Sequence, residues 1–173
     1  MKLRLIPVGN VDNKILKKIK DGLEQTFGCP SKIEKEIDNL AQAYDPRRKQ
    51  YSAPVLLSIL KTQRVEKDEK VLGISDIDLY APGLNFVFGE ADTLSEVAII
   101  SLHRLRQDYY GLPPDEVLFQ DRATKEAIHE LGHTFGLGHC PDTRCIMQFS
   151  NTLADTDWKL AVFCNQCHPK LIR

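Results

Sequence analysis

Three histidines and a glutamate fall within one eleven-residue segment, from His129 to His139. His129 and His133 are four residues apart, so a helix would place both imidazoles on one face, where they can bind the same ion. Glu130 follows the first histidine directly and can reach a water on that ion without being a ligand itself. This spacing predicts a zinc site with Glu130 as the general base.

A third ligand follows after a glycine. A catalytic zinc ion has three protein ligands and an open fourth position. Gly136 tolerates a left-handed conformation, so the helix can end there and the chain can return with His139. Three neutral imidazoles leave the ion's charge free to lower the pKa of water from ~15.7 towards ~7. The alternative, ordinary histidines on a helix, requires the whole pattern to arise by chance.

Four cysteines come after the third histidine in two pairs, Cys140 with Cys145 and Cys164 with Cys167. Such pairs are typical of a closed, tetrahedral structural zinc site, which can supply folding free energy to a segment with little core. Disulfides and a redox pair are alternatives, and Cys164-x-x-Cys167-His168 also matches a haem-attachment pattern. Cys29 is left over and is expected to be an inert buried thiol.

The overall composition is that of an ordinary globular domain. Lys and Arg number 23 and Asp and Glu number 24, a balance that gives no basic surface for nucleic acid or an anionic membrane. The apolar run before Pro7 is too short for a signal peptide, and no run approaches the ~20 residues that span a bilayer. We therefore expect a cytoplasmic protein with no nucleic-acid or membrane partner.

Several elements must position these residues, and hydrophobic spacing predicts where they lie. Strands are expected at 2–8, 71–74, 85–89 and 97–105, with weak strand character at 31–37. Helices are expected after Asp12 up to Phe27, at 55–60, from the N-cap Asp121 to Gly136, and around 152–163. The third of these helices would carry the histidine pair.

The segment resembles the metzincins, whose three-histidine pattern is followed by a turn that contains a methionine. Met147 is in the corresponding place, eight residues after His139. The continuation His139-Cys140, Cys145-x-Met147 and Cys164-x-x-Cys167 is similar to the archaemetzincins in particular. The segments 73–80 and 110–114 also look like that family, so the resemblance covers roughly residues 70–170 well.

The resemblance implies an α+β fold in one metallopeptidase domain, residues 1–173. Its upper part, about 1–136, would contain a mixed, twisted sheet of about five strands with helices packed on it. Its small cysteine-rich lower part, about 137–173, would contain the structural zinc and Met147 beneath the catalytic zinc. The active-site helix would form the base of the cleft, and an edge strand near 85–89 would pair with an extended substrate.

The expected function is therefore a zinc-dependent peptidase, a monomer with two zinc ions per chain that acts on a peptide or small-protein substrate. The alternative is a catalytically silent zinc-binding protein that uses the same fold to bind a peptide or partner. Loss of the general base would be the simplest route to such a silent protein. Glu130 is present, which favours catalysis.

Overall fold

A five-stranded sheet forms the centre of the computed structural model, which describes residues 1–172. The strand order is β2-β1-β5-β8-β7, and only β7 runs antiparallel to its neighbour. The strands are β1 (Lys2–Val8), β2 (Ser31–Ile33), β5 (Glu69–Ser75), β7 (Gly89–Asp92) and β8 (Val97–Ser101). The predicted α+β class with a mixed five-stranded sheet is confirmed.

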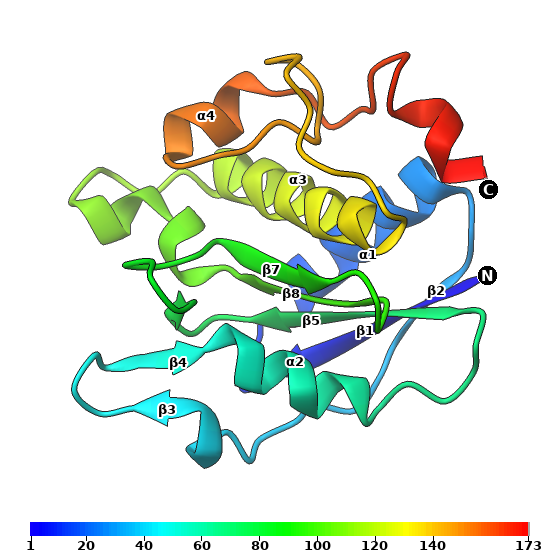
Figure 1. Cartoon of the computed structure of the whole chain (residues 1–173). Helices are drawn as coiled ribbons and strands as arrows, with labels where there is room; N and C mark the ends of the chain where they lie inside the picture. Colours follow the sequence, from blue (N-terminus) through cyan, green and yellow to red (C-terminus); the bar gives the residue numbers. More distant parts are fainter. Residues whose placement is uncertain (173) are drawn as a thin grey trace.

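Helices cover both faces of this sheet (Figure 1). Helices α1 (Asn13–Phe27) and α3 (Glu116–Thr134) pack on one face, and α2 (Ala53–Lys61) packs on the other. Strand β5 is buried along its whole length because both faces are covered, and its middle residues, 71–74, are apolar or glycine. No helix within residues 1–172 is long and apolar enough to cross a membrane.

Short elements that hydrophobic spacing did not predict complete the fold. Within residues 1–172 there are also four 3₁₀ turns, and a second, three-stranded sheet has the order β3-β4-β6. Its strands are β3 (Tyr44–Asp45), β4 (Gln50–Ser52) and β6 (Leu79–Tyr80). The 3₁₀ turns are η1 (Ala41–Ala43), η2 (His103–Leu105), η3 (Gln107–Tyr110) and η4 (His168–Ile172). Strands of two or three residues are too short to show a periodic pattern.

The predicted edge strand 85–89 is wrong in position, because the ladder with β8 begins at Gly89 and continues to Asp92. Val87 instead bridges to Leu79 of the small sheet, which draws this segment away. The predicted strand 97–105 is also too long, since the chain leaves β8 after Ser101 and enters the 3₁₀ turn η2.

Two helix boundaries differ from the prediction. Helix α3 begins earlier, because the side chain of Asp115 accepts a hydrogen bond from the Leu118 backbone at 2.9 Å. Asp121 lies within the helix and pairs with Lys125 at 2.7 Å. The last helix, α4 (Leu153–Trp158), is shorter than 152–163, since the chain beyond it hydrogen-bonds to residues 144–146 instead.

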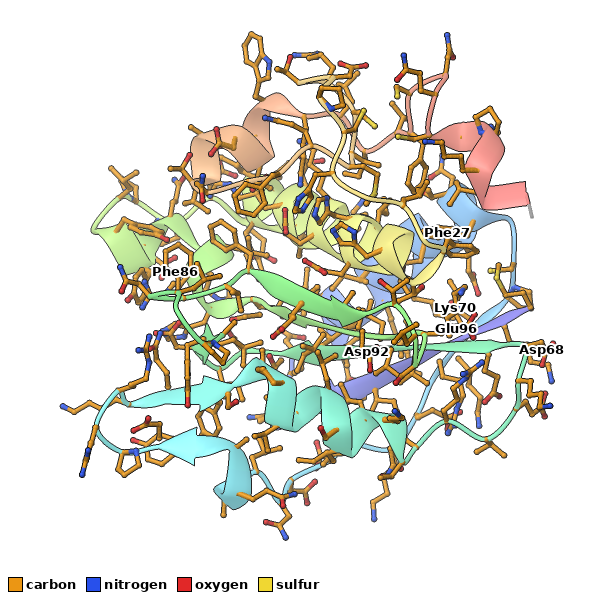
Figure 2. All side chains as sticks on the ribbon, in the orientation of Figure 1. Phe27, Asp68, Lys70, Phe86, Asp92 and Glu96 are labelled. Carbon is orange, nitrogen blue, oxygen red and sulfur yellow. The ribbon has the colours of Figure 1, made fainter. Side chains whose placement is uncertain are left out.

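The C-terminal end of α3 is anchored to the sheet by Lys70 of β5 (Figure 2). The Lys70 ammonium group donates to the carbonyl of Thr134 at 2.7 Å and forms an ion pair with Glu96 at 3.2 Å. It also lies 4.3 Å from the centre of the Phe135 ring, which stacks on Phe27. A cation at a helix C-terminus stabilises the exposed carbonyl groups there. The helix therefore ends in a fixed position just before the chain turns back with His139.

Candidate metal centre and active site

The three histidines of the motif come together at one point. His129 and His133 lie one turn apart on α3, and the Gly136 turn, with φ of 82°, lets the chain return with His139. One ring nitrogen from each histidine lies within 4.8 Å of the other two. The Nε2 atoms of His129 and His133 are 3.1 Å apart, close to the ~3.3 Å expected for two imidazoles on a tetrahedral zinc ion.

Backbone carbonyl groups fix which ring nitrogen faces the centre. His129 Nδ1 lies 2.8 Å from the Ile146 carbonyl oxygen, and His133 Nδ1 lies 2.7 Å from that of Leu137. A carbonyl oxygen can only accept, so each Nδ1 carries the proton and each Nε2 keeps a lone pair. Two lone pairs then face each other across 3.1 Å, an arrangement that suits a cation between them.

The environment also keeps these histidines neutral, the form that binds a metal. Burial lowers the pKa of His129 well below its usual range, and the charge of Lys159 adds to the effect. Burial likewise lowers the pKa of His133. His139 is the exposed member of the three, and its ring packs against Phe149 with centroids 4.8 Å apart. The donor set therefore fits a zinc ion.

Glu130 is buried beside this centre, in space that a glycine leaves open. A Cβ atom on Gly89 would lie 2.5 Å from Glu130 Cγ and 2.7 Å from its Oε1, closer than atoms can approach. Gly89 begins the edge strand β7, so the absence of a side chain there lets the strand pack directly on the glutamate. Burial, reinforced by the nearby charge of Glu126, raises the pKa of Glu130 well above its usual range. This role of Gly89 was not predicted from the sequence.

Met147 lies beneath α3, in the turn that follows the third histidine. Its side chain is fully buried and packs where Gly132 leaves no Cβ in the way. Its carbonyl oxygen accepts a hydrogen bond from the Cys140 backbone at 2.9 Å. The preceding residue, Ile146, supplies the carbonyl that orients His129. This turn therefore links the histidines to the cysteine cluster.

Lys159 and Glu126 form a buried ion pair one helical turn before Glu130. This pair was not predicted from the sequence. The Lys159 ammonium group lies 3.0 Å from a carboxylate oxygen of Glu126, and both side chains are almost fully buried. Lys159 also approaches the Gln148 carbonyl oxygen at 3.4 Å. Breaking a buried pair leaves an uncompensated charge, so this contact holds the segment after Met147 against α3.

The four clustered cysteines also converge. Their sulfur atoms all lie within 4.8 Å of one another, and Cys140 Sγ is 3.7 Å from Cys164 Sγ. That separation matches the ~3.8 Å expected for two thiolates on a tetrahedral zinc ion and is far too long for a disulfide bond. All five cysteines of the chain are free, and Cys29 lies apart from the cluster.

The thiols of the cluster have unequal proton affinities. Burial opposes the thiolate of Cys164, but hydrogen bonds, chiefly from the Gln166 and Cys167 backbones, outweigh it and lower its pKa to about 7. Burial and the neighbouring thiols raise the pKa of Cys167. Four thiolates this close repel one another unless a cation neutralises them, so the cluster fits a metal ion.

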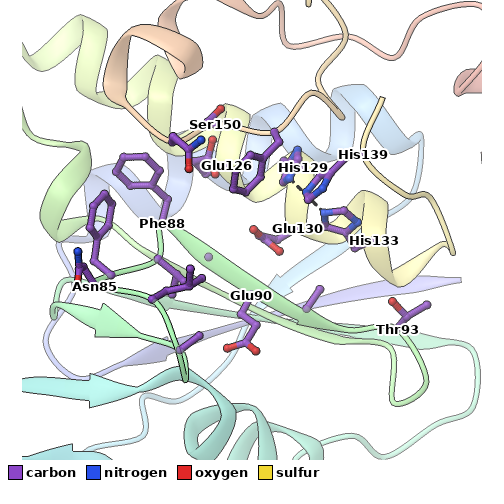
Figure 3. A pocket seen from close by; sticks show the side chains of 18 residues that line it. Asn85, Phe88, Glu90, Thr93, Glu126, His129, Glu130, His133, His139 and Ser150 are labelled. Atoms are coloured by element: carbon purple, nitrogen blue, oxygen red, sulfur yellow. Dashed lines mark hydrogen bonds between the residues drawn. The ribbon is translucent and has the colours of Figure 1, made fainter. Parts of the chain in front are cut away.

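An open cleft of about 500 Å³ runs along these residues (Figure 3). The segment from Leu84 to Ala91 lines the cleft, as do Phe149, Ser150 and Asn151. Glu130 and the three histidines also border it. The fold and this site define a zinc-dependent metallopeptidase.

Comparison with known proteins agrees with this class. The sequence pattern of Peptidase family M54 matches residues 13–173. The archaemetzincin of Methanocaldococcus jannaschii is 43% identical over 99% of this chain and 93% of its own length. That of Pyrococcus furiosus is 44% identical over 96% and 90%, respectively.

Solved structures show the same relationship. The crystal structure of archaemetzincin from Methanopyrus kandleri aligns with a TM-score of 0.86 and 41% identity, covering all of this chain and 94% of that one. A zinc-dependent peptidase from Methanocorpusculum labreanum aligns with a TM-score of 0.90 and 33% identity, covering 98% and 99%. The chain belongs to peptidase family M54, the archaemetzincins, and is a zinc-dependent peptidase.

Proposed function

We propose that His129, His133 and His139 hold the zinc ion through which this peptidase works. The observation that carries the proposal is the pair of facing Nε2 atoms at 3.1 Å, both fixed as lone-pair donors by backbone carbonyl groups. When bound there, zinc would polarise the substrate carbonyl and make water acidic. The proton transfers and the positioning of the substrate would be carried out by the protein's own residues.

Glu130 would act as the general base in this reaction. Its carboxylate would accept a proton from the attacking water and pass that proton to the amine that leaves as the peptide bond breaks. Burial supports the role, because a raised pKa makes the carboxylate a better proton acceptor. Gly89 would keep the carboxylate in place by excluding any side chain from that position.

The substrate would bind as an extended strand along β7, at the free edge of the five-stranded sheet. The Ser101 backbone donates to the Phe88 carbonyl oxygen, so by antiparallel alternation Gly89 and Ala91 present their N–H and C=O groups outward. Outside the strand ladders, neither N–H group donates a backbone hydrogen bond within residues 1–172. A peptide that paired there would lie in the cleft beside Glu130.

A second zinc ion, held by Cys140, Cys145, Cys164 and Cys167, would give this peptidase two zinc ions per chain. Its role would be structural, because four thiolates leave no open position. Cys140 directly follows His139, so the ion would also fix the third histidine. The lower part of the domain, about 137–173, would then depend on this ion for its stability, while the upper part, about 1–136, would depend on its own core.

Peptides or small proteins are the substrates proposed for this cleft, and the chain is proposed to work as a cytoplasmic monomer. A silent binding protein with the same fold is the alternative. The buried Glu130 favours catalysis, since a binding protein gains nothing from a desolvated carboxylate beside three imidazoles. Neither comparison with relatives nor the geometry of the cleft supports the silent alternative.

The test is cleavage of a diverse peptide library, read by mass spectrometry, with zinc-loaded wild-type protein and Glu130→Ala in parallel. Loss of a general base lowers the rate by about 10²–10⁴-fold, so cuts by the wild type should vanish in the variant. Glu130→Gln, which keeps the shape of the side chain, should fail equally. Equal cleavage by all three proteins, with zinc confirmed bound, would show that Glu130 is not the base.

A further inference from the structure

Within residues 1–172, Glu90 is a carboxylate of the cleft without an ion-pair partner. It lies in the middle of β7, is partly buried, and borders the cleft beside the active site. Its Oε2 atom is enclosed without a hydrogen bond, and within residues 1–172 no ion pair reaches either carboxylate oxygen. Burial raises the pKa of Glu90, because nothing nearby compensates its charge.

Buried polar atoms without partners are few in this protein. Within residues 1–172 they are Glu90 Oε2, Gln148 Oε1 and Ser150 Oγ, and two of these three residues border the cleft. Native proteins pair nearly all buried polar groups, so an unpaired one in a cleft is available to a bound ligand. For a carboxylate without a neighbouring cation, the matching ligand is a cationic nitrogen group.

Glu90 faces away from the zinc site. In the β7–β8 ladder Gly89 is opposite Ile100, whose side chain belongs to the core between the sheet and α3. Glu90 is opposite Ile99, whose side chain belongs to the core beneath α2. Figure 3 shows the result, with Glu130 and Glu90 on opposite sides of β7. The edge strand therefore presents the reacting site on one face and an unpaired carboxylate on the other.

A substrate strand paired with β7 would present its side chains in the same alternation. The substrate residue opposite Gly89 lies on the face of Glu130, where the bond is cut. Its neighbour, opposite Glu90, has its side chain on the face of Glu90, with the two Cβ atoms about 5 Å apart. A carboxylate at that distance can contact a long, positively charged side chain directly.

We propose that Glu90 selects substrates with a lysine or arginine side chain at the position that pairs with it, next to the residue opposite Gly89. This inference rests on the proposed binding of the substrate along β7. The nearby carboxylate of Glu126 is already neutralised by Lys159, so it does not compete for the substrate's cation. Glu90 is the specificity residue, and Glu130 remains the base.

The test measures cleavage of acetylated, amidated octapeptides by the zinc-loaded protein. The peptides share one sequence except at a single test position, which is lysine, arginine, glutamine or norleucine. Further sets place the test position at each of the other positions in turn. At one position close to the cut bond, kcat/KM should be on the order of tenfold higher for lysine and arginine than for glutamine or norleucine. Glu90→Gln should remove this preference, so that kcat/KM no longer differs between the basic and the neutral peptides.

Glu36→Gln is the matched control, because it makes the same change at an exposed residue next to β2, at the opposite edge of the sheet. It should keep the preference for basic side chains. A cationic nitrogen could come from a basic side chain or from the amino terminus of the substrate. A set of peptides with a free α-amino group distinguishes these two sources. A preference that follows the free amino terminus rather than the side chain would overturn the inference.

A binding measurement separates this inference from the peptidase mechanism. Calorimetric titration measures the affinity of the lysine and glutamine peptides without any cleavage. The two proteins compared are zinc-loaded Glu130→Gln and zinc-loaded Glu130→Gln that also has Glu90→Gln. Tighter binding of the lysine peptide that disappears with Glu90→Gln supports the role of Glu90 even if nothing is cut. Equal binding of the two peptides, or a preference that survives Glu90→Gln, overturns it even if Glu130-dependent cleavage is established.

Discussion

Gly89→Ala should inactivate the enzyme without unfolding it. The added Cβ would lie 2.5 Å from Glu130 Cγ, whereas ordinary contact begins near 3.4 Å. Glu130 or the edge strand must therefore move by about 0.9 Å, the difference between these two distances. The backbone of Gly89 is not in the left-handed region, so alanine itself adds no strain there.

A displacement of this size acts directly on the catalytic step. Misplacing a catalytic group by ~1 Å can lower the rate by about 10²-fold, which corresponds to about 2.7 kcal/mol of activation free energy. The histidines and cysteines are untouched by the substitution, so zinc binding should be retained. We expect kcat to fall about a hundredfold while zinc content and the melting temperature stay close to wild type.

The assay is the initial rate of peptide cleavage by liquid chromatography and mass spectrometry, with zinc measured by plasma mass spectrometry. Gly138→Ala is the matched control, because a Cβ there would meet no atom within 4 Å and its φ is not positive. It should cut at close to the wild-type rate. If Gly89→Ala with bound zinc also cuts at that rate, the close approach of β7 does not position Glu130, and the argument from packing fails.

Two further predictions concern the cysteine cluster and an ion pair on α1. Cys167→Ser should lower bound zinc from two ions per chain to one and lower the melting temperature by on the order of 10 °C. The control Cys29→Ser should change neither quantity. If Cys167→Ser still binds two zinc ions, the cysteine cluster is not a zinc site. Glu24 accepts hydrogen bonds from Lys20 and Ser31 that lower its pKa from 4.5 to about 2. Its stabilising contribution is therefore fully present above pH 4.5 and is lost as the pH falls towards 2. Carboxyl NMR can measure the pKa of Glu24, with Glu24→Gln identifying its signal. A titration midpoint near 4.5 would contradict the prediction.

Local patterns were sufficient to predict the arrangement of the histidine pair. Helical periodicity alone places His129 and His133 on one face, and the Gly136 turn is visible as a glycine before His139. The start of the same helix was predicted wrongly, because Asp115 and Asp121 are equally plausible caps by type. Which one caps depends on a hydrogen bond to Leu118 that only the folded chain reveals.

Contacts between distant segments were not predictable from spacing. Gly89 has no signal of its own in the sequence, and its importance comes from Glu130, a residue on another element. Lysine side chains usually lie on the surface, yet Lys70 and Lys159 are both buried and form ion pairs with Glu96 and Glu126. Lysine is seldom buried without a partner, so these positions become informative only once the partner is known.

The three glutamates that border the cleft differ in their surroundings, and those differences assign them different tasks. Glu126 is paired with Lys159, so it holds structure and is not available to the substrate. Glu130 is buried beside the imidazoles, where a raised pKa suits a proton acceptor. Glu90 has no ion-pair partner within residues 1–172 and lies on the other face of β7. The side chains of a peptide paired with β7 alternate between the two faces of that strand. Glu130 would therefore act at one substrate residue, and Glu90 would select the side chain of its neighbour.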